Sequence, residues 1–360
     1  MADEALMQKI KNLNDLGLAV LICLIAREHF LIGTTVSSQD EVTHELEQIV
    51  NNVFSLRYVT IEFSQSTTSD EFAQLIILSE INVSNSDAPT RNRSEKILNN
   101  SATFQFSSRS SATKFPSTPT SIFNVIIAKN LNNASKQVQN QVLELVRTKR
   151  LLSKSSIYHV PEQFLLIVVL AAGEGLDLTK HLNDYIFMSH FHNPQYSIDD
   201  QEENFNGDSS SSVVKLRSSQ KEKCEKNSPV VSPQEIEKLS RFSESVTLSM
   251  EVKQYQMDII SFLRLHRAVA GGITASATKV FDKLAKCLAT IHNLTFVTPS
   301  LVALAARKVY FHRIKKVKPE NERSIKWGSD VEAVAALLKR ITVEDILEEV
   351  LGNSGVEAPL

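Results

Sequence analysis

The sequence is poor in cysteine. Only Cys23, Cys224 and Cys287 occur among the 360 residues, and none of them belongs to a CxxC pair. This spacing argues against a disulfide framework and against a cysteine-based zinc site. Few cysteines also favour a reducing compartment, so we expect a protein of the cytoplasm, the nucleus or both. Cys23 and Cys287 stand in apolar stretches, and we expect both thiols in the core.

Long apolar runs and a strong net charge are also missing. The most apolar run extends only from Leu16 to Ile25, whereas a membrane-spanning helix needs about 20 apolar residues. The N-terminal stretch MADEALMQKIKNLND has no apolar core of the secretory kind. The net charge of −2 gives no general attraction to nucleic acid or to anionic membranes. We therefore expect an intracellular protein without membrane association.

In the first half of the chain, predicted strands alternate with predicted helices. Residues 122–128 and 164–170 are continuous apolar runs, typical of parallel strands that are covered on both faces. Residues 39–54 and 135–151 carry apolar positions at helical spacing. This alternation predicts an α/β layer with a mainly parallel sheet. Further strands are expected at residues 29–32, 57–63, 157–160 and 185–192, a buried helix at 16–28 and an apolar element of ambiguous type at 72–79.

The last third of the chain is predicted to be helical throughout. The pair Gly271-Gly272 interrupts it, and Thr274 or Ser276 is placed to cap the helix that follows. Thr298 is a good N-cap for another helix, because a proline comes directly after it. Further helices are expected at residues 234–250, 252–269, 330–339 and 343–351.

Two segments offer too little apolar surface to offset the entropy of ordering them. Residues 82–120 are rich in Ser, Asn and Thr, and residues 193–233 are rich in Ser and acidic side chains. We expect both to be flexible. The predicted organisation is therefore an α/β core at residues 1–192, a disordered linker at 193–233 and a helical lid domain at 234–360.

Several stretches occur in an order that is typical of one branch of ATPases. They are HFLIGTT, VIIAKNLNNASKQVQNQVLEL, FLLIVVLAAGEG, HLNDYIFMSHF and GITASATKVFDKLAKCLATIHNLTFVTPSLVALAARKVYFHRI. Together they resemble the MoxR and magnesium-chelatase branch of the AAA+ ATPases, which implies a nucleotide-binding α/β core followed by a helical lid. A flavodoxin-like fold with an unrelated helical tail is the alternative, but it does not account for core and lid signatures that arrive together and in order.

The resemblance implies a phosphate-binding loop whose residues have changed in this chain. Such a loop needs a lysine and a serine or threonine, and these positions are Asp40 and Glu41 here. No lysine occurs from Asn12 to Glu95, so shifting the alignment does not restore one. Carboxylates at this place would repel the phosphates. Gly33 is the only glycine near the loop, so close backbone approach is lost as well.

Five further positions implied by the resemblance are altered. The Asp-Glu pair that holds magnesium and activates water is replaced by Lys129 and Asn130. Lysine offers no oxygen ligand and asparagine is not a base, so neither residue can take over its role. Ala171 or Ala172 takes the place of the polar sensor of the core. Tyr185 takes the place of the arginine that reaches a neighbouring subunit's nucleotide, and Ser276 that of the sensor arginine of the lid.

These replacements imply that the AAA+-like fold is retained while the residues for nucleotide hydrolysis are lost. We therefore predict a non-catalytic pseudo-ATPase that needs no cofactor and binds protein partners. The chain also resembles, in size and design, the telomere-capping maintenance family of yeasts, which implies a direct or indirect role in telomere capping. An active ATPase of the MoxR and chelatase type is the alternative, and it would need an unconventional phosphate site.

The densest basic cluster is a candidate surface for nucleic acid or an acidic partner. Cations are also favoured at a helix C-terminus by the macrodipole, which explains such a cluster without any ligand. Nucleic-acid binding would show a steep salt dependence. His190 and His192 share one face of a predicted strand, but no third ligand is near, so we expect no metal site. The cluster consists of Arg307, Lys308, Arg313, Lys315, Lys316 and Lys318.

Overall fold

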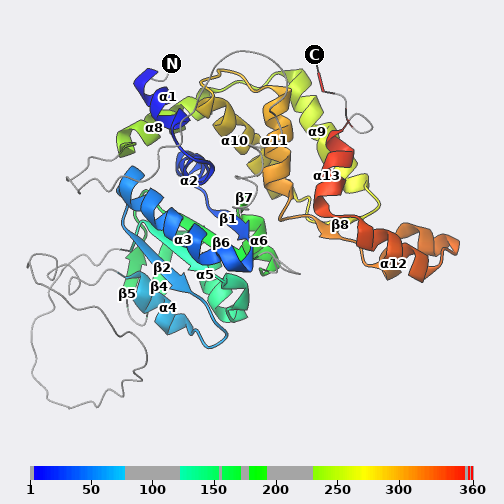
Figure 1. The fold of residues 1–360 in the computed structure, drawn as a ribbon, viewed down its shortest axis with the longest axis horizontal. Helices are drawn as coiled ribbons and strands as arrows, with labels where there is room; N and C mark the ends of the chain where they lie inside the picture. Colours follow the sequence, from blue (N-terminus) through cyan, green and yellow to red (C-terminus); the bar gives the residue numbers. More distant parts are fainter. Residues whose placement is uncertain are drawn as a thin grey trace, which may run out of the picture.

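The computed structural model describes residues 4–77, 122–153, 156–171, 178–192, 230–352, 356 and 358–359. The insertion expected at residues 82–120 and nearly all of the linker expected at 193–233 lie outside these residues. The described chain forms a parallel sheet flanked by helices, with a helical region beside it (Figure 1). The predicted fold class, an α/β core followed by a helical lid, is confirmed.

The core is a five-stranded sheet in the order β2-β3-β6-β1-β7, and every neighbouring pair is parallel. Parallel neighbours require crossover connections, and helices supply them here. All five strands therefore end at one side of the sheet, the carboxyl edge, and begin at the other, the amino edge. The strands are β1 (Phe30–Thr34), β2 (Tyr58–Glu62), β3 (Val125–Lys129), β6 (Leu165–Ala171) and β7 (Met188–His192).

Alternate residues of each strand serve the two faces of the sheet. In β3, Val125 and Ile127 belong to one apolar cluster, whereas Ile126 and Ala128 belong to another. Helices of the first half that contribute to the first cluster include α2 (Asp15–Ala26) and α3 (Gln39–Gln48), which continues as a π-helical turn (Ile49–Val53). Those of the second cluster are α4 (Ser69–Ile76), α5 (Lys136–Thr148) and α6 (Lys180–Tyr185).

Local caps decide where several elements begin and end. The ambiguous segment near residue 72 is the helix α4, because Thr68 and Glu71 form a capping box at its start. Lys149 takes a left-handed backbone conformation and ends α5, so the helix predicted to reach residue 151 is shorter. An antiparallel pair, β4 (Arg150–Ser153) and β5 (Ser156–His159), follows it. The strand expected from residue 185 begins only at β7, because the chain before it forms α6.

The last third of the chain is almost entirely helical, as predicted. Thr274 caps α10 by accepting a hydrogen bond from the amide of Ala277, and Thr298 with Pro299 opens α11. The exception is an antiparallel ribbon of β8 (Val269–Gly271) and β9 (Lys315–Lys316), which the sequence did not predict. The helices are α8 (Pro233–Ser245), α9 (Met250–Leu265), α10 (Ala275–Ile291), α11 (Pro299–Tyr310), α12 (Val331–Arg340) and α13 (Val343–Leu351).

The N-terminal helices join the sheet to this helical region. Helix α2 packs against α8 and α10, and one apolar cluster contains residues of α2, of the sheet and of the lid helices. Helix α1 (Glu4–Lys11) lies beside α8 (Figure 1), where the Lys9 ammonium is 2.8 Å from a Glu235 carboxylate oxygen. Val231 is buried, and its amide donates to the carbonyl of Val53 at 3.1 Å. Helix α8 begins at Pro233, one residue before the lid start expected at residue 234.

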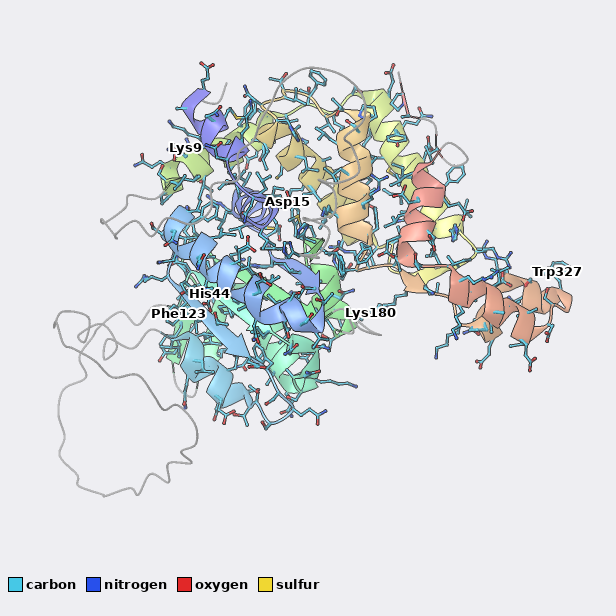
Figure 2. The ribbon with its side chains drawn as sticks, viewed as in Figure 1. Lys9, Asp15, His44, Phe123, Lys180 and Trp327 are labelled. Carbon is cyan, nitrogen blue, oxygen red and sulfur yellow. The ribbon has the colours of Figure 1, made fainter. Side chains whose placement is uncertain are left out.

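Residues 318–341 form an arm that projects from the rest of the molecule (Figure 1). Helix α12 packs on a short 3-10 turn (Pro319–Asn321). Trp327 lies at the far end of this projecting arm (Figure 2) and is 89% exposed. Helix α13 then returns to pack against α9 and α11. Among the described helices, none combines the length and the apolar character that crossing a bilayer requires.

Candidate functional site

Of the seven positions that the resemblance marks as altered, five lie at the carboxyl edge of the sheet. Strand β1 ends at Thr34, and only residues 35–38 separate it from α3. Gly33 lies within β1 and not in a turn, and a Cβ there would come 3.3 Å from the ring of Phe191. The hydroxyl of Thr35 donates to that of Ser38 at 3.0 Å. The connection is thus one 3-10 turn, shorter than the glycine-rich loops whose amides surround a phosphate.

Asp40 and Glu41 occupy the first turn of α3. The ammonium of Lys129, at the end of β3, donates to a carboxylate oxygen of Asp40 at 2.5 Å. The Lys129 side chain is 12% exposed and that of Asp40 is 91% exposed. Acidic side chains also favour the positive end of a helix. Two altered positions therefore come together, as the resemblance implies, and their charges neutralise each other.

Asn130 is engaged in the same way. Its backbone is left-handed, with φ of 55°, and its amide donates to the carbonyl of Val169 at 3.0 Å. The side-chain amide of Gln39 donates both to the Asn130 side-chain oxygen, at 2.8 Å, and to the Val169 carbonyl, at 3.3 Å. Gln39 was not singled out from the sequence, although it directly precedes Asp40. Its amide closes the space between α3 and the ends of β3 and β6.

Ala171 ends β6 and pairs in register with Thr34 at the end of β1. Its methyl group offers no polar contact to a ligand. The hydroxyl of Thr34 is buried and has no hydrogen-bond partner among the described residues. Residues 172–177, with the alternative position Ala172, lie outside the part of the chain that the structure describes.

The other two altered positions lie at the amino edge. Tyr185 ends α6 just before β7, whose first residue pairs in register with Phe30 at the start of β1. Ser276 is in the first turn of α10, two residues after Thr274. The Thr274 hydroxyl donates to an Asp184 carboxylate oxygen at 2.8 Å, so this end of α10 also lies at the amino edge. Within one chain, Tyr185 and Ser276 therefore lie at the edge of the sheet opposite to Asp40.

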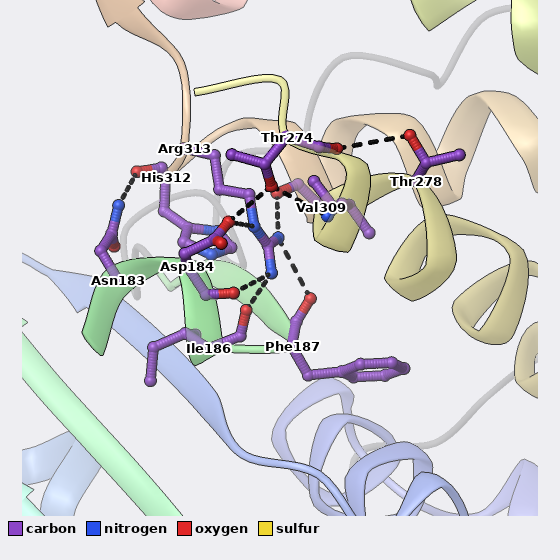
Figure 3. A network of polar contacts seen from close by, with 10 residues as sticks. Asn183, Asp184, Ile186, Phe187, Thr274, Thr278, Val309, His312 and Arg313 are labelled. Carbon is purple, nitrogen blue, oxygen red and sulfur yellow. Dashed lines mark hydrogen bonds and ion pairs between the residues drawn. The ribbon is translucent and has the colours of Figure 1, made fainter. Parts of the chain in front are cut away.

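A buried arginine ties the amino edge to the lid (Figure 3). Arg313 is 2% exposed. Its guanidinium donates to the carbonyls of Val309 at 2.5 Å and Asp184 at 3.3 Å, and to that of Ile186. The Asp184 carboxylate lies 3.9 Å from its Nε. Burial lowers the pKa of Arg313 to about 10, against the opposing effect of Asp184, so the group is charged at neutral pH.

This burial corrects the prediction of a single basic surface. Arg313 does not belong to an exposed surface, because α11 ends there and its guanidinium turns inward to backbone carbonyls. Arg307 forms an ion pair with Glu348 at 2.9 Å, and the Lys308 ammonium lies 2.9 Å from His190 Nδ1. The members that stay exposed without an ion pair among the described residues are Lys315, Lys316 and Lys318. The burial of Arg313 could not be predicted from the sequence, because a basic helix end has the same residue pattern whether its side chains face solvent or fold back.

His190 and His192 lie on β7 with ring centroids 6.1 Å apart. Within the described ranges, no group of three or more histidines, cysteines or acids could hold a metal ion. Burial, and then the neighbouring Lys308, lower the pKa of His190 to about 4, so this imidazole is neutral at pH 7. Cys23 and Cys287 are both buried, as expected, and burial raises the pKa of the Cys287 thiol to about 12.

A known structure shares this fold. A protein of Cytophaga hutchinsonii, provisionally identified as an ATPase, matches with a TM-score of 0.56 at 15% identity, over 93% of this chain and 95% of that one. A full-length MCM homologue of Methanopyrus kandleri matches with a TM-score of 0.45 at 9% identity, over 86% of this chain and 58% of that one. No protein-family model and no curated protein matches the sequence. The chain thus has the AAA+-like α/β fold with helices added to a parallel five-stranded core.

Proposed function

We propose that this chain is a non-catalytic pseudo-ATPase whose AAA+-like fold serves to bind protein partners. Within that fold, the sequence resemblance to the MoxR and magnesium-chelatase branch is part of the proposal. The protein would act without a cofactor, in the cytoplasm, the nucleus or both. Its partners would recognise the surface of the fold and not a nucleotide-dependent state.

The observation that carries this proposal is the mutual pairing of polar groups at the carboxyl edge. The Lys129 ammonium is bound to Asp40, and the Gln39 amide is bound to Asn130. A phosphate would have to break these contacts and lie against the carboxylates of Asp40 and Glu41, which repel it. A magnesium ion would meet an ammonium where it needs oxygen ligands. These contacts support an empty nucleotide site over the alternative of an active ATPase.

The test is equilibrium binding of a fluorescent ATP analogue to the purified full-length chain with magnesium, measured together with phosphate release. We expect neither binding at millimolar nucleotide nor release. Binding at micromolar nucleotide without release would replace the empty scaffold with a nucleotide-held one. Release that persists after removal of contaminating ATPases would contradict the proposal and favour the active enzyme.

A double variant makes the test sharper. Asp40→Lys with Glu41→Thr restores the residue types that a phosphate loop needs. We expect no nucleotide binding from it, because residues 35–38 form a single 3-10 turn that cannot wrap around a phosphate. Binding by this variant alone would mean that the two side chains, and not the short connection, disabled the site.

The finer part of the proposal is participation in telomere capping. Only the sequence resemblance to the telomere-capping maintenance family of yeasts supports it. Chromatin immunoprecipitation of the tagged chain in its own host, with telomeric and internal DNA compared, tests a direct role. Enrichment at telomeric DNA would support that role. Equal recovery of both DNAs would argue against direct contact.

A further inference from the structure

A pocket of about 300 Å³ lies where α6 meets the lid. Lys180 and His181, at the start of α6, form one side of it. Gly271, Thr274 and Lys315, from β8, the cap of α10 and β9, form the other side. Lys180 lies at the margin of the core (Figure 2), and the pocket opens to solvent between the two regions.

The described residues that line the pocket carry more positive charge than one carboxylate can neutralise. Asp184 is the only acid among them. That carboxylate accepts a hydrogen bond from Thr274 at 2.8 Å and lies 3.9 Å from the buried Arg313, so its charge is already compensated (Figure 3). Lys180 and Lys315 are exposed, and neither forms an ion pair with any described residue. The two ammonium groups therefore leave a positive surplus at the pocket mouth.

A pair of glycines keeps one wall of the pocket bare. No atom lies within 4 Å of the place where a Cβ of Gly271 would stand. Gly272 has a φ of +104°, and a Cβ there would come 1.8 Å from the carbonyl oxygen of Arg313. The backbone at Gly272 is thus fixed by close packing against Arg313, whereas the backbone at Gly271 leaves room for an extended chain.

We propose that this pocket binds an acidic peptide segment of a partner protein, with Lys180 and Lys315 each pairing with a carboxylate. This inference rests on the proposed function, since it names the chemistry of a partner for the scaffold. The two lysines come from different elements, α6 and β9, which suits two spaced carboxylates. A compact phosphate is less suited, because it prefers a free arginine fork or converging amides. The guanidinium of Arg313 is not free, since it donates to backbone carbonyls.

The experiment measures fluorescence anisotropy of a labelled peptide of alternating glycine and glutamate, titrated with the full-length protein. A peptide with glutamine in place of glutamate is the neutral probe. The pocket variant is Lys180→Glu with Lys315→Glu, and the control variant is Lys326→Glu with Lys339→Glu. The control residues are exposed on the projecting arm and carry the same charge change. All four side chains are exposed, so we expect both variants to fold, and their thermal unfolding curves verify it.

We expect the glutamate peptide to bind about tenfold more weakly to the pocket variant, from two reversed surface charges. The control variant should bind it like the parent protein, and the glutamine peptide should not bind. Equal weakening in both variants would overturn the proposal, since the attraction would then come from net charge alone. Equal binding of the glutamine peptide would overturn it too. Competition by inorganic phosphate at matched ionic strength would reassign the pocket to small anions.

The outcomes for this pocket and for the proposed function are separate. Nucleotide turnover with intact peptide binding would contradict the pseudo-ATPase and leave the pocket. Absence of both turnover and peptide binding would reject the pocket and leave the pseudo-ATPase.

Discussion

The two edges of the parallel sheet differ in how their polar groups are held. At the carboxyl edge, Lys129 meets a carboxylate on Asp40 that is 91% exposed. At the amino edge, Arg313 is buried, and its donors reach carbonyls of both the core and the lid. Exposed pairs contribute little to stability, whereas a buried charge is tolerated only when its partners are in place. The polar contacts of the carboxyl edge therefore contribute little to stability, whereas those that join the amino edge to the lid contribute much.

The largest effect is expected from Arg313→Met. The substitution leaves several buried carbonyls without their donor and removes the cation beside the Asp184 carboxylate. We expect the free energy of unfolding to fall by about 3–5 kcal/mol. Urea denaturation measures it, and Lys129→Met, at the other edge, is the control with an expected loss below about 1 kcal/mol. Similar losses in the two variants would remove the contrast between the edges.

The glycine pair gives the next largest effect. Gly272→Ala forces a side chain onto a backbone with φ of +104° and against the carbonyl of Arg313. We expect a loss of about 2–3 kcal/mol in urea denaturation. Gly271→Ala is the matched control, since its new methyl group would meet nothing within 4 Å. If Gly271→Ala proved as damaging as Gly272→Ala, the joint would not depend on this close approach.

Acid should weaken the joint in part through His190. Its pKa is lowered from 6.5 to about 4 by burial and by Lys308, with Asp15 opposing and His192 adding to the decrease. The unfolded chain therefore binds more protons between these values, and stability is lost as pH falls. We expect roughly 2 kcal/mol less stability at pH 5 than at pH 7 from this group alone.

His190→Gln tests the assignment, because glutamine can still accept a hydrogen bond from Lys308 but does not titrate. The variant should lose less stability between pH 7 and pH 5 than the parent does. The buried His29 and His312 have pKa values lowered by burial in the same direction, so some acid sensitivity should persist. An unchanged pH profile in the variant would show that His190 is not the group responsible.

The smallest effect is expected from Asp40→Asn. The side chain is almost fully exposed, so loss of its pair with Lys129 should cost under about 1 kcal/mol. The same variant removes one repelling carboxylate, and we expect no gain in nucleotide binding, because Gln39 still closes the space beside Asn130. A large loss of stability would mean that the carboxyl edge is as tightly determined as the joint.

The sheet could be predicted from the sequence because its strands carry a strong signal. Continuous apolar runs such as 122–128 and 164–170 are typical of strands in a sheet that is covered on both faces. The cap at Thr274 likewise acts through local chemistry, and the structure confirms it. Thr298 also stands at the N-cap position before Pro299, but its hydroxyl makes no capping hydrogen bond. The short α6 was not predicted, because six residues carry too little periodicity to distinguish a helix from a strand.

The site was predictable in part. The resemblance assigned Asp40 and Lys129 to one nucleotide site, and the structure brings their side chains into contact. The burial of Arg313 was not predictable, because nothing in a basic helix end tells where its side chains fold back. The partners of α2 were equally hidden, since a helix that is apolar on every side does not say what covers it.

The packing of α2 has a consequence for synthesis of the chain. Its covering helices, α8 and α10, lie more than half the chain further on, and Lys283 reaches back to Glu28 across 255 positions. Contacts so distant along the chain slow folding. A ribosome would release the sheet long before the helices that cover α2. This nascent chain should therefore need a chaperone until its C-terminal helices emerge.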